Sequence, residues 1–284
     1  MPDSATPHME LKTTAWAVTD GIGTITLSRP HRHNAWTGRM HTEMRHLLQL
    51  AENDPTIRVV IIAGDPDGKT FCPGADSQAL ETHVDRGGYD PGTPDDIATP
   101  GHGVDPAFDA DFAYFLGLET ITIAAVNGAA AGVGLVIACW CDIRIIAEDA
   151  KLTTAHGKLN LPVEYGLSWL LPRLIGLSRA TDLLLTSRPI LGREAAALGL
   201  ANRSVPRDDV VATATDYART LIDTISPHSL RATKRQLAMD TTHNDAGRSI
   251  RDAQARLDQM STEADYREAT AALVEKRAAR WTDQ

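Results

Sequence analysis

Cysteine is scarce in this chain of 284 residues, which has only three thiols, at Cys72, Cys139 and Cys141. A set this small, and odd in number, gives no disulfide framework and suits a reducing compartment. Cys139 and Cys141 are too close in sequence for an ordinary bridge, and no second cysteine or histidine pair completes a zinc site. We therefore expect buried apolar thiols, no bound metal and a cytoplasmic location.

Basic runs and an apolar leader are also missing. The formal net charge is -9, and without a Lys/Arg-rich run the chain lacks the footprint of a nucleic-acid-binding protein. The N-terminus, MPDSATPHMELKTT, is polar and has no apolar signal core, so no secretion is expected. Hydrophobic residues make up 43% and charged residues 23%, which is ordinary for a soluble globular protein.

One uncharged stretch, from Ile121 to Cys141, needs an explanation. It has roughly the length of the ~20 residues that a membrane helix requires. However, it contains Asn127 and a group of glycines, and its first part, ITIAAV, is typical of a short strand. We interpret it as a strand, a glycine-rich turn and a buried helix, and expect no membrane association.

Strand and helix patterns alternate through most of the chain. An Asp20-Gly21 turn predicts a hairpin, and the apolar run IRVVIIAG predicts a strand buried on both faces. From about Arg207 onwards, helical stripes alternate with breaks. We therefore predict an α/β core over residues 1–206 and a helical region over residues 207–284.

Residues 81–111 differ from the rest, because they are rich in Gly, Pro and Asp and poor in large apolar side chains. This composition predicts a long flexible loop. Such a loop could be a lid or a binding loop, and a merely tolerated insertion is an equally good explanation.

Common catalytic motifs are absent, since the glycines form neither a P-loop nor a good dinucleotide fingerprint and no G-x-S-x-G elbow occurs. Two glycine-rich turns remain, FCPGAD and VNGAAAGVG, each after an apolar strand and each before an expected helix N-terminus. Free backbone N–H groups at such a place stabilise an anion or a developing oxyanion. Either turn alone is most often only structural.

Taken together, six segments resemble the enoyl-CoA hydratase/isomerase, or crotonase, family over nearly the whole chain. The segments are ITLSRPHRHNAW, IRVVIIAGDPDGKTFCPGAD, AAVNGAAAGVGLVIACWCDIRIIAEDAKL, LPVEYGLSWLLPRLIG, SPHSLRATKRQL and VEKRAARW. The resemblance implies an α/β, crotonase-like spiral of ββα units with a C-terminal helical trimerisation region, as a homotrimer or a dimer of trimers. It also implies acyl-CoA substrates, with coenzyme A as part of the substrate and no separate cofactor.

The resemblance further implies an oxyanion hole for a thioester enolate, made by the N–H groups of Ala75 and Val133. The family usually has glycine at the second position; valine supplies the same N–H, but its Cβ narrows the approach. Lys276 and Arg277 are implied to contact CoA, but they could equally form an exposed, solvated basic face without such a contact. The residues implied to contact CoA are His31, Arg32 and His33, then Ala75, Asp76 and Ser77, and finally Lys276 and Arg277 in the C-terminal helix.

Hydratases of the family resemble one another in using two glutamates, and this chain has Val136 and His156 at those places. Glu164, in LPVEYG, occupies the position where some isomerases of the family carry a single acidic base. One base suffices to move a proton between C2 and C4 of a 3-enoyl-CoA, and apolar surroundings would raise its pKa suitably. We therefore expect isomerase-type chemistry, with Glu164 as proton shuttle and His156 assisting.

Two other functions stay open. His156 and Glu164 could together activate water, which would make the protein an atypical hydratase or a hydrolase. Alternatively, Val136 marks an inactive acyl-CoA-binding paralogue, although the retained Glu164 argues against this. The structural alternatives are that Glu164 is a surface acid and that His156 is a hydrogen-bonded structural histidine.

Overall fold

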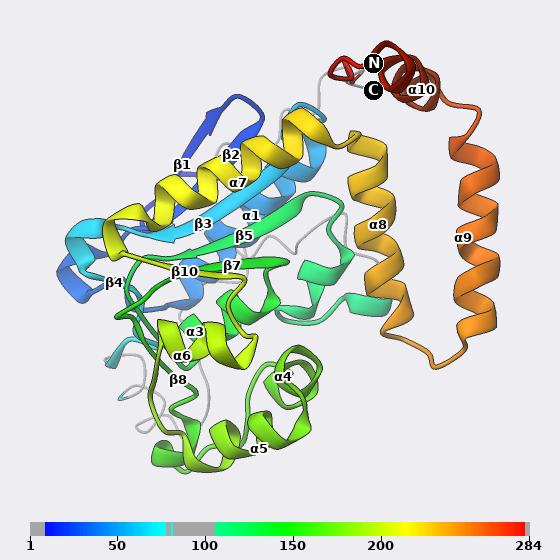
Figure 1. Ribbon diagram of the computed structural model, residues 1–284. Coiled ribbons are helices and arrows are strands. Elements are labelled where there is room, and N and C mark those ends of the chain that lie inside the picture. The colour runs from blue at the N-terminus through cyan, green and yellow to red at the C-terminus, as the bar shows by residue number, and fades with distance from the viewer. Residues whose placement is uncertain (1–8, 78–80, 82–105, 282–284) are drawn as a thin grey trace.

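A six-stranded β-sheet forms the centre of the protein in the computed structural model, which describes residues 9–77, 81 and 106–281 (Figure 1). Its strand order is β1-β2-β3-β5-β7-β10. The predicted hairpin is confirmed, since β1 and β2 are antiparallel with Thr19 opposite Ile22 across the Asp20-Gly21 turn. All other neighbours in this sheet are parallel. The strands are β1 (Thr14–Thr19), β2 (Ile22–Leu27), β3 (Val59–Gly64), β5 (Ile121–Val126), β7 (Ile143–Ala147) and β10 (Arg203–Val205).

A second, smaller sheet is built from four short strands, three of which follow a strand of the large sheet. Its order is β4-β6-β8-β9, and its strands are β4 (Thr70–Cys72), β6 (Ala129–Ala131), β8 (Lys151–Thr153) and β9 (Ile190–Leu191). β4 follows β3, β6 follows β5, and β8 follows β7. The chain therefore winds as repeated ββα units, which confirms the predicted spiral.

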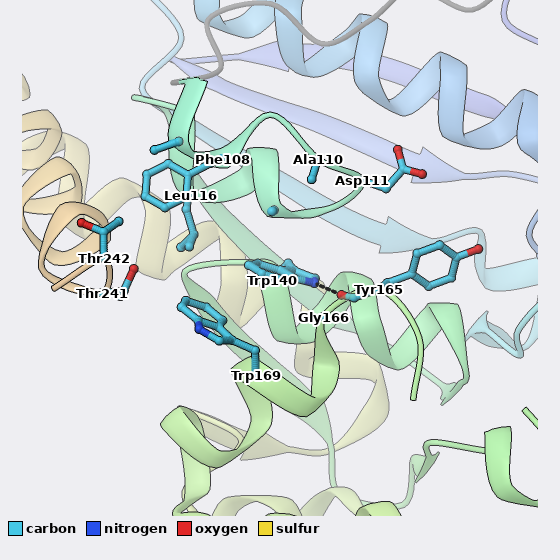
Figure 2. A pocket seen from close by; sticks show the side chains of 12 residues that line it. Phe108, Ala110, Asp111, Leu116, Trp140, Tyr165, Gly166, Trp169, Thr241 and Thr242 are labelled. Carbon is cyan, nitrogen blue, oxygen red and sulfur yellow. Dashed lines mark hydrogen bonds between the residues drawn. The ribbon is translucent and has the colours of Figure 1, made fainter. Parts of the chain in front are cut away.

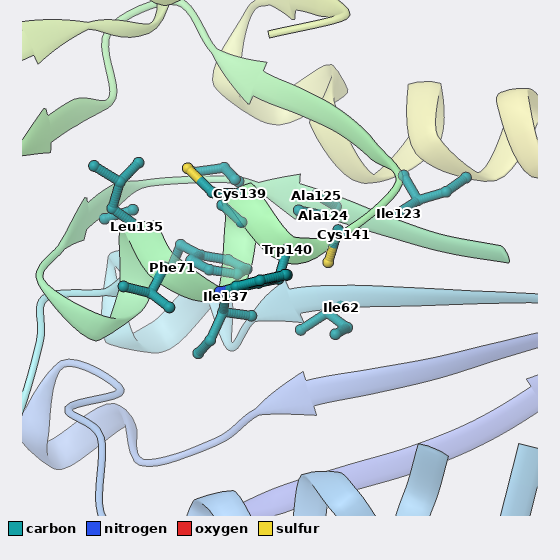
Figure 3. Close-up of a cluster of buried hydrophobic side chains, with 14 of the residues drawn as sticks. Ile62, Phe71, Ile123, Ala124, Ala125, Leu135, Ile137, Cys139, Trp140 and Cys141 are labelled. Carbon is teal, nitrogen blue, oxygen red and sulfur yellow. The ribbon is translucent and has the colours of Figure 1, made fainter. Parts of the chain in front are cut away.

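The uncharged stretch forms β5, β6 and helix α3 (Val133–Trp140), so the interpretation as strand, turn and helix is confirmed. The short strand β6 inside the glycine-rich turn was not predicted. Every residue of α3 is buried, and Figure 3 shows its side chains among those of the neighbouring strands. Among the helices of the described residues, none is long and apolar enough to span a bilayer.

The C-terminal helices differ in how they contact the sheets. Helix α7 (Val210–Thr224) packs on β3, β5 and β7. Helix α8 (Pro227–Asp240) contacts β5 and the 3₁₀ helix η4 (Ala113–Gly117). Helices α9 (Ala246–Met260) and α10 (Ala264–Glu275) extend away from the large sheet (Figure 1). No residue of α9 is buried. The helical region is present as predicted, whereas a domain boundary at residue 206 stays a prediction.

The remaining elements connect or cover the sheets. Residues 82–105 of the predicted long loop lie outside the described residues, but its last part forms the 3₁₀ helix η3, in which Phe108 is buried. The other helices are α1 (Gly38–Asn53), α4 (Leu167–Ile175), α5 (Leu177–Thr186) and α6 (Gly192–Leu198), with 3₁₀ helices η1 (Pro30–Arg32), η2 (Pro66–Gly68), η3 (Pro106–Phe108), η4 (Ala113–Gly117), η5 (His156–Leu159) and η6 (Arg207–Asp209).

Candidate functional site

The two glycine-rich turns lie side by side because the short strands within them, β4 and β6, are neighbours. β4 and β6 pair in parallel, and a Cβ atom on Gly132 would lie 3.9 Å from the Cα of Gly74. Helix α3 approaches β4 so closely that a Cβ at Gly134 would lie 2.0 Å from the carbonyl oxygen of Cys72. Only glycine fits there, and this close packing brings the first turn of α3 next to the turn after β4.

The backbone around Ala75 is held by Trp36 on one side. The Trp36 N–H donates to the Gly74 carbonyl at 2.8 Å, and the Asp76 N–H donates to the Trp36 carbonyl at 2.9 Å. In such a parallel bridge the N–H of the residue between the two bonds points to the opposite side. The Ala75 N–H is therefore directed away from Trp36, and Ala75 itself is exposed.

Val133 contributes the second amide as the first residue of α3. The preceding Gly132 has a left-handed φ of 50° and makes no side-chain cap, and the first-turn N–H groups of a helix have no acceptor within it. Within the described parts of the chain, the N–H groups of Ala75 and Val133 have no hydrogen-bond acceptor. We call these two groups the amide pair; neighbouring donors at a helix N-terminus suit a developing negative charge.

Asp76 connects the first of these turns to the predicted CoA turn. Its carboxylate is 3% exposed and forms ion pairs with Arg29 at 2.8 Å and with Arg32 at 2.6 Å. The Arg32 Nη2 also lies 3.3 Å from the Ser77 Oγ. The structure therefore brings together Arg32, Asp76 and Ser77, but the Arg32 guanidinium is bonded to the other two side chains. Arg29 was not predicted, because its only signal in the sequence is its place directly before the turn.

The two histidines of the predicted CoA turn are both exposed. His33 Nδ1 lies 3.1 Å from the carbonyl oxygen of Gly68, and His33 itself has a left-handed φ of 53°. The turn is thus tied to η2 through the ring of His33. His31 and His33 remain available at the surface, and their contact with CoA stays a prediction.

The expectation that Lys276 and Arg277 lie within the C-terminal helix is wrong. Helix α10 ends at Glu275, and Lys276 has a left-handed φ of 53°, the conformation that commonly ends a helix. Arg277 pairs with Glu268 and with Glu275, both at 2.6 Å. α10 lies far from β4 in the same chain, so these residues are not brought to Arg32 or Asp76 (Figure 1).

His156 lies near enough to Glu164 for its charge to affect the pKa of that carboxyl. His156 begins η5 and is 8% exposed, whereas Glu164 is half-buried just before Tyr165, which has a left-handed φ of 51°. Burial raises the pKa of the Glu164 carboxyl, and the charge of His156 partly opposes that rise. Val136 is 3% exposed on α3. We call the two titratable residues the His156–Glu164 pair.

Trp140 links the segment of Glu164 to the helix that carries Val133. Its indole Nε1 donates to the Tyr165 carbonyl at 3.0 Å (Figure 2). Its ring is stacked with Trp169, with centroids 6.1 Å apart and planes 12° from parallel. Sequence analysis does not single out Trp140, because nothing in its position along the chain shows that it reaches residue 165.

A cavity of about 660 Å³ lies beside this link. It is mostly apolar and open, and Figure 2 shows its side chains. In the described parts of the chain, no group of three or more His, Cys, Asp or Glu residues is placed to hold a metal ion. The cavity is lined by Ala107, Phe108, Ala110, Asp111, Ala113, Leu116, Trp140, Tyr165, Gly166, Trp169, Thr241 and Thr242.

Comparison with known proteins agrees with this arrangement. The sequence pattern of the enoyl-CoA hydratase/isomerase family matches residues 17–284. The 1,2-epoxyphenylacetyl-CoA isomerase of Escherichia coli K12 is 32% identical over 270 residues, which cover 93% of this chain and 96% of that protein.

Solved structures show the same fold. A protein of Mycobacterium abscessus described as a probable enoyl-CoA hydratase/isomerase superposes with a TM-score of 0.83 at 30% identity, covering 95% of this chain and 99% of that one. An enoyl-CoA hydratase of Bacillus anthracis superposes with a TM-score of 0.81 at 25% identity, covering 96% and 100%. The spiral fold and the match over nearly its whole length show that this chain belongs to the enoyl-CoA hydratase/isomerase family of enzymes.

Proposed function

We propose that the protein is an isomerase-type acyl-CoA enzyme in which Glu164 carries a proton between two carbons of the substrate. The observation that carries this proposal is a single half-buried carboxyl with a raised pKa, on a segment that is bonded to the helix of the amide pair. A raised pKa suits a group that must both accept and return a proton near neutral pH.

The proposed reaction starts from a 3-enoyl-CoA. The Glu164 carboxylate takes a proton from C2, and the electron pair moves into the thioester carbonyl to give a dienolate. The N–H groups of Ala75 and Val133 donate to its oxygen, which lowers the energy of this intermediate. Protonated Glu164 then delivers the proton to C4, the double bond moves to C2–C3, and the carboxylate is regenerated.

Val136 supports a single-base mechanism. It is a buried aliphatic side chain at the place where the family resemblance puts the first glutamate of a hydratase. A valine cannot transfer a proton, so the chain lacks one of the two groups that a standard hydration needs. The similarity to a protein named 1,2-epoxyphenylacetyl-CoA isomerase points in the same direction.

A second candidate function follows from His156. Because His156 lies near enough to affect the pKa of Glu164, the two groups together could activate a water molecule. The protein would then be an atypical hydratase, or a hydrolase that cleaves the thioester or a carbon–carbon bond.

Product mass distinguishes these functions. The purified protein is incubated with 2-enoyl-CoA and, separately, with 3-enoyl-CoA, and the products are followed by mass spectrometry. We expect a moved double bond at constant mass. A gain of one water would establish hydration instead, and a cleaved product hydrolysis. Tight binding of acyl-CoA without turnover would mean an inactive binding paralogue.

We also propose that the protein acts in the cytoplasm as a homotrimer or a dimer of trimers. Apolar side chains on the C-terminal helices support the assembly: Ile250 is 67% exposed, Leu257 60% and Leu273 79%. A second copy that covered such side chains would remove their apolar area from water. The molar mass in solution, measured by light scattering, tests the proposal, and a monomer at micromolar concentration would contradict it.

A further inference from the structure

Two aromatic residues with left-handed backbones contact each other beside the proposed base. Phe112 has a φ of 64° and Tyr165 a φ of 51°, and their ring centroids are 4.9 Å apart with planes at 68°. Bulky side chains rarely adopt this conformation, which persists only where the surrounding structure enforces it and which is common at functional sites. Because Tyr165 directly follows Glu164, the contacts that hold these two rings also hold the proposed base.

Phe112 also reaches the amide pair, through Trp36. The ring centroids of Phe112 and Trp36 are 5.8 Å apart, and the Phe112 side chain is fully buried. Trp36 makes the two backbone hydrogen bonds on either side of Ala75, with Gly74 and Asp76. One buried ring therefore contacts both the residue that holds the Ala75 amide and the residue that follows Glu164.

Helix α1 holds this part of the chain with two side chains that lie one turn apart. The His41 ring is stacked on Phe112, with centroids 4.8 Å apart and planes 2° from parallel, and its Nε2 lies 3.3 Å from the Tyr114 hydroxyl. The Arg45 guanidinium lies 4.6 Å from the centre of the Tyr114 ring, and its Nη1 lies 3.6 Å from the Asp111 carboxylate. The residues before and after Phe112 are thus fixed to α1.

The His41 ring is uncharged at neutral pH. Burial lowers the pKa of His41 to about 4, although the nearby Asp111 carboxylate opposes the fall. A neutral ring stacks on Phe112 without placing a charge in the core. His41 therefore serves as a packing partner of Phe112 near neutral pH, and not as an acid or a base.

From these contacts we infer that Phe112 is a positioning residue, which fixes the Glu164 segment relative to the Ala75 amide and is itself oriented by His41. The inference rests on the proposed function, in which a proton leaves C2 while the amide pair binds the oxygen on the neighbouring carbon. The groups that act on two adjacent atoms must be held at a fixed separation, and a misplacement of about 1 Å can lower the rate about 100-fold. Trp140 binds the carbonyl of Tyr165, whereas Phe112 contacts its ring, which points away from Trp140 (Figure 2).

The test compares Phe112→Leu with Phe115→Leu in the full-length protein. Both rings are fully buried, and Phe115 stacks on Tyr114 with centroids 5.1 Å apart, so both variants should lower the melting temperature to a similar degree. Only Phe112→Leu should lower kcat on 3-enoyl-CoA, by about 10- to 100-fold with KM nearly unchanged.

The pH profile and two variants of His41 separate positioning from a loss of stability. In Phe112→Leu the acid limb of kcat/KM should move to lower pH, because a loosened Glu164 carboxyl becomes more hydrated and its raised pKa falls. Phe115→Leu should leave the profile unchanged. His41→Ala should lower kcat as Phe112→Leu does, whereas His41→Phe keeps a stacked ring and should retain most of it.

Hydrogen exchange measures the same positioning without any reaction. In Phe112→Leu, exchange of the amides of residues 164–167 and of Asp76 should become up to about tenfold faster, and in Phe115→Leu it should not. If this difference appears but 3-enoyl-CoA is not isomerised, the proposed function fails and the inference stands. Equal exchange in the two variants, or equal kcat where isomerisation is observed, would overturn the inference.

Discussion

The amide pair and the His156–Glu164 pair are held in opposite ways. Ala75 and Val133 present backbone groups, and their positions depend on strand pairing, on the Trp36 bridge and on the nearly buried Asp76. Glu164 presents a side chain from a segment with a left-handed residue, and the indole of Trp140 is a hydrogen-bonded anchor for it. A backbone N–H is present whatever the side chain, so valine can replace the usual glycine at position 133. Proton transfer by a side chain, in contrast, requires a residue that can take up and release a proton.

Glu164→Gln tests the second pair most directly and should have the largest effect. The amide has nearly the same shape but cannot accept a proton, so kcat on 3-enoyl-CoA should fall about 10²- to 10⁴-fold. Glu148→Gln, at an exposed carboxylate, is the matched control. Undiminished turnover of Glu164→Gln would remove the assignment of Glu164 as the base.

The pH dependence of the two proteins sharpens this test. Burial raises the pKa of Glu164 above its ordinary value of 4.5, and only the unprotonated carboxylate acts as the base. We expect kcat/KM of the unmodified protein to rise with pH through that raised pKa.

Stability should change in the opposite direction: a carboxyl with a raised pKa in the folded state favours folding at low pH, and this contribution is lost as pH rises through the folded pKa. The melting temperature of Glu164→Gln relative to the unmodified protein should therefore increase over the same range.

Asp76→Asn tests how the amide pair is held and should have the next largest effect. Removing one partner of a buried ion pair costs about 3–5 kcal/mol. We expect the free energy of unfolding to fall by roughly 2–3 kcal/mol here, since Arg29 is 15% and Arg32 33% exposed. Because Asp76 adjoins Ala75, kcat should also fall. Urea unfolding and steady-state kinetics measure the two effects.

The matched control is Asp182→Asn, which removes a surface pair with Arg188 and should cost at most about 1 kcal/mol. Equal effects of Asp76→Asn and Asp182→Asn on stability would mean that the Asp76 ion pairs do not hold this turn.

Trp140→Phe tests the hydrogen bond from helix α3 to the Glu164 segment. The variant keeps an aromatic ring but loses the hydrogen bond to the Tyr165 carbonyl, which contributes about 1 kcal/mol. We expect kcat to fall about fivefold, and the melting temperature to fall as well, because the buried indole also loses packing. Trp169→Phe, which removes an indole without that bond, should leave kcat on a short substrate unchanged. A larger loss in Trp169→Phe than in Trp140→Phe would contradict the role of the bond.

Arg277→Ala lies outside both pairs and should have the smallest effect. Arg277 is exposed and pairs with Glu268 and Glu275, so we expect no change in the melting temperature. If Arg277 lies near the CoA bound to a neighbouring subunit, KM for the thioester should rise by less than about fivefold in the variant, with kcat unchanged. Arg251→Ala on α9 is the control. An unchanged KM in Arg277→Ala would favour a solvated basic face.

Most of the fold could be predicted from local patterns. The hairpin at Asp20-Gly21, the buried strand β3 and the strand–turn–helix of residues 121–140 follow from a turn dipeptide, short apolar runs and glycine positions. The strand β6 could not be predicted, because three alanines carry no strand signal and their pairing with β4 and β8 depends on the sheet around them. The end of α10 was not predicted, because Lys276 adopts a left-handed conformation. Lysine rarely adopts this conformation, so a lysine in the sequence does not indicate the end of a helix.

For the candidate site, the sequence by itself determined which chemical groups are available: two glycine-rich turns with free amides, a valine at position 136, and a single acid at position 164. Only the tertiary structure decided which of them meet. The ion pair of Arg29 with Asp76 joins residues 47 apart in the chain, and the bond from Trp140 to Tyr165 joins residues 25 apart. Such contacts depend on the order in which strands pair and on the closeness with which α3 packs on β4, and neither is written in the neighbouring residues of the chain.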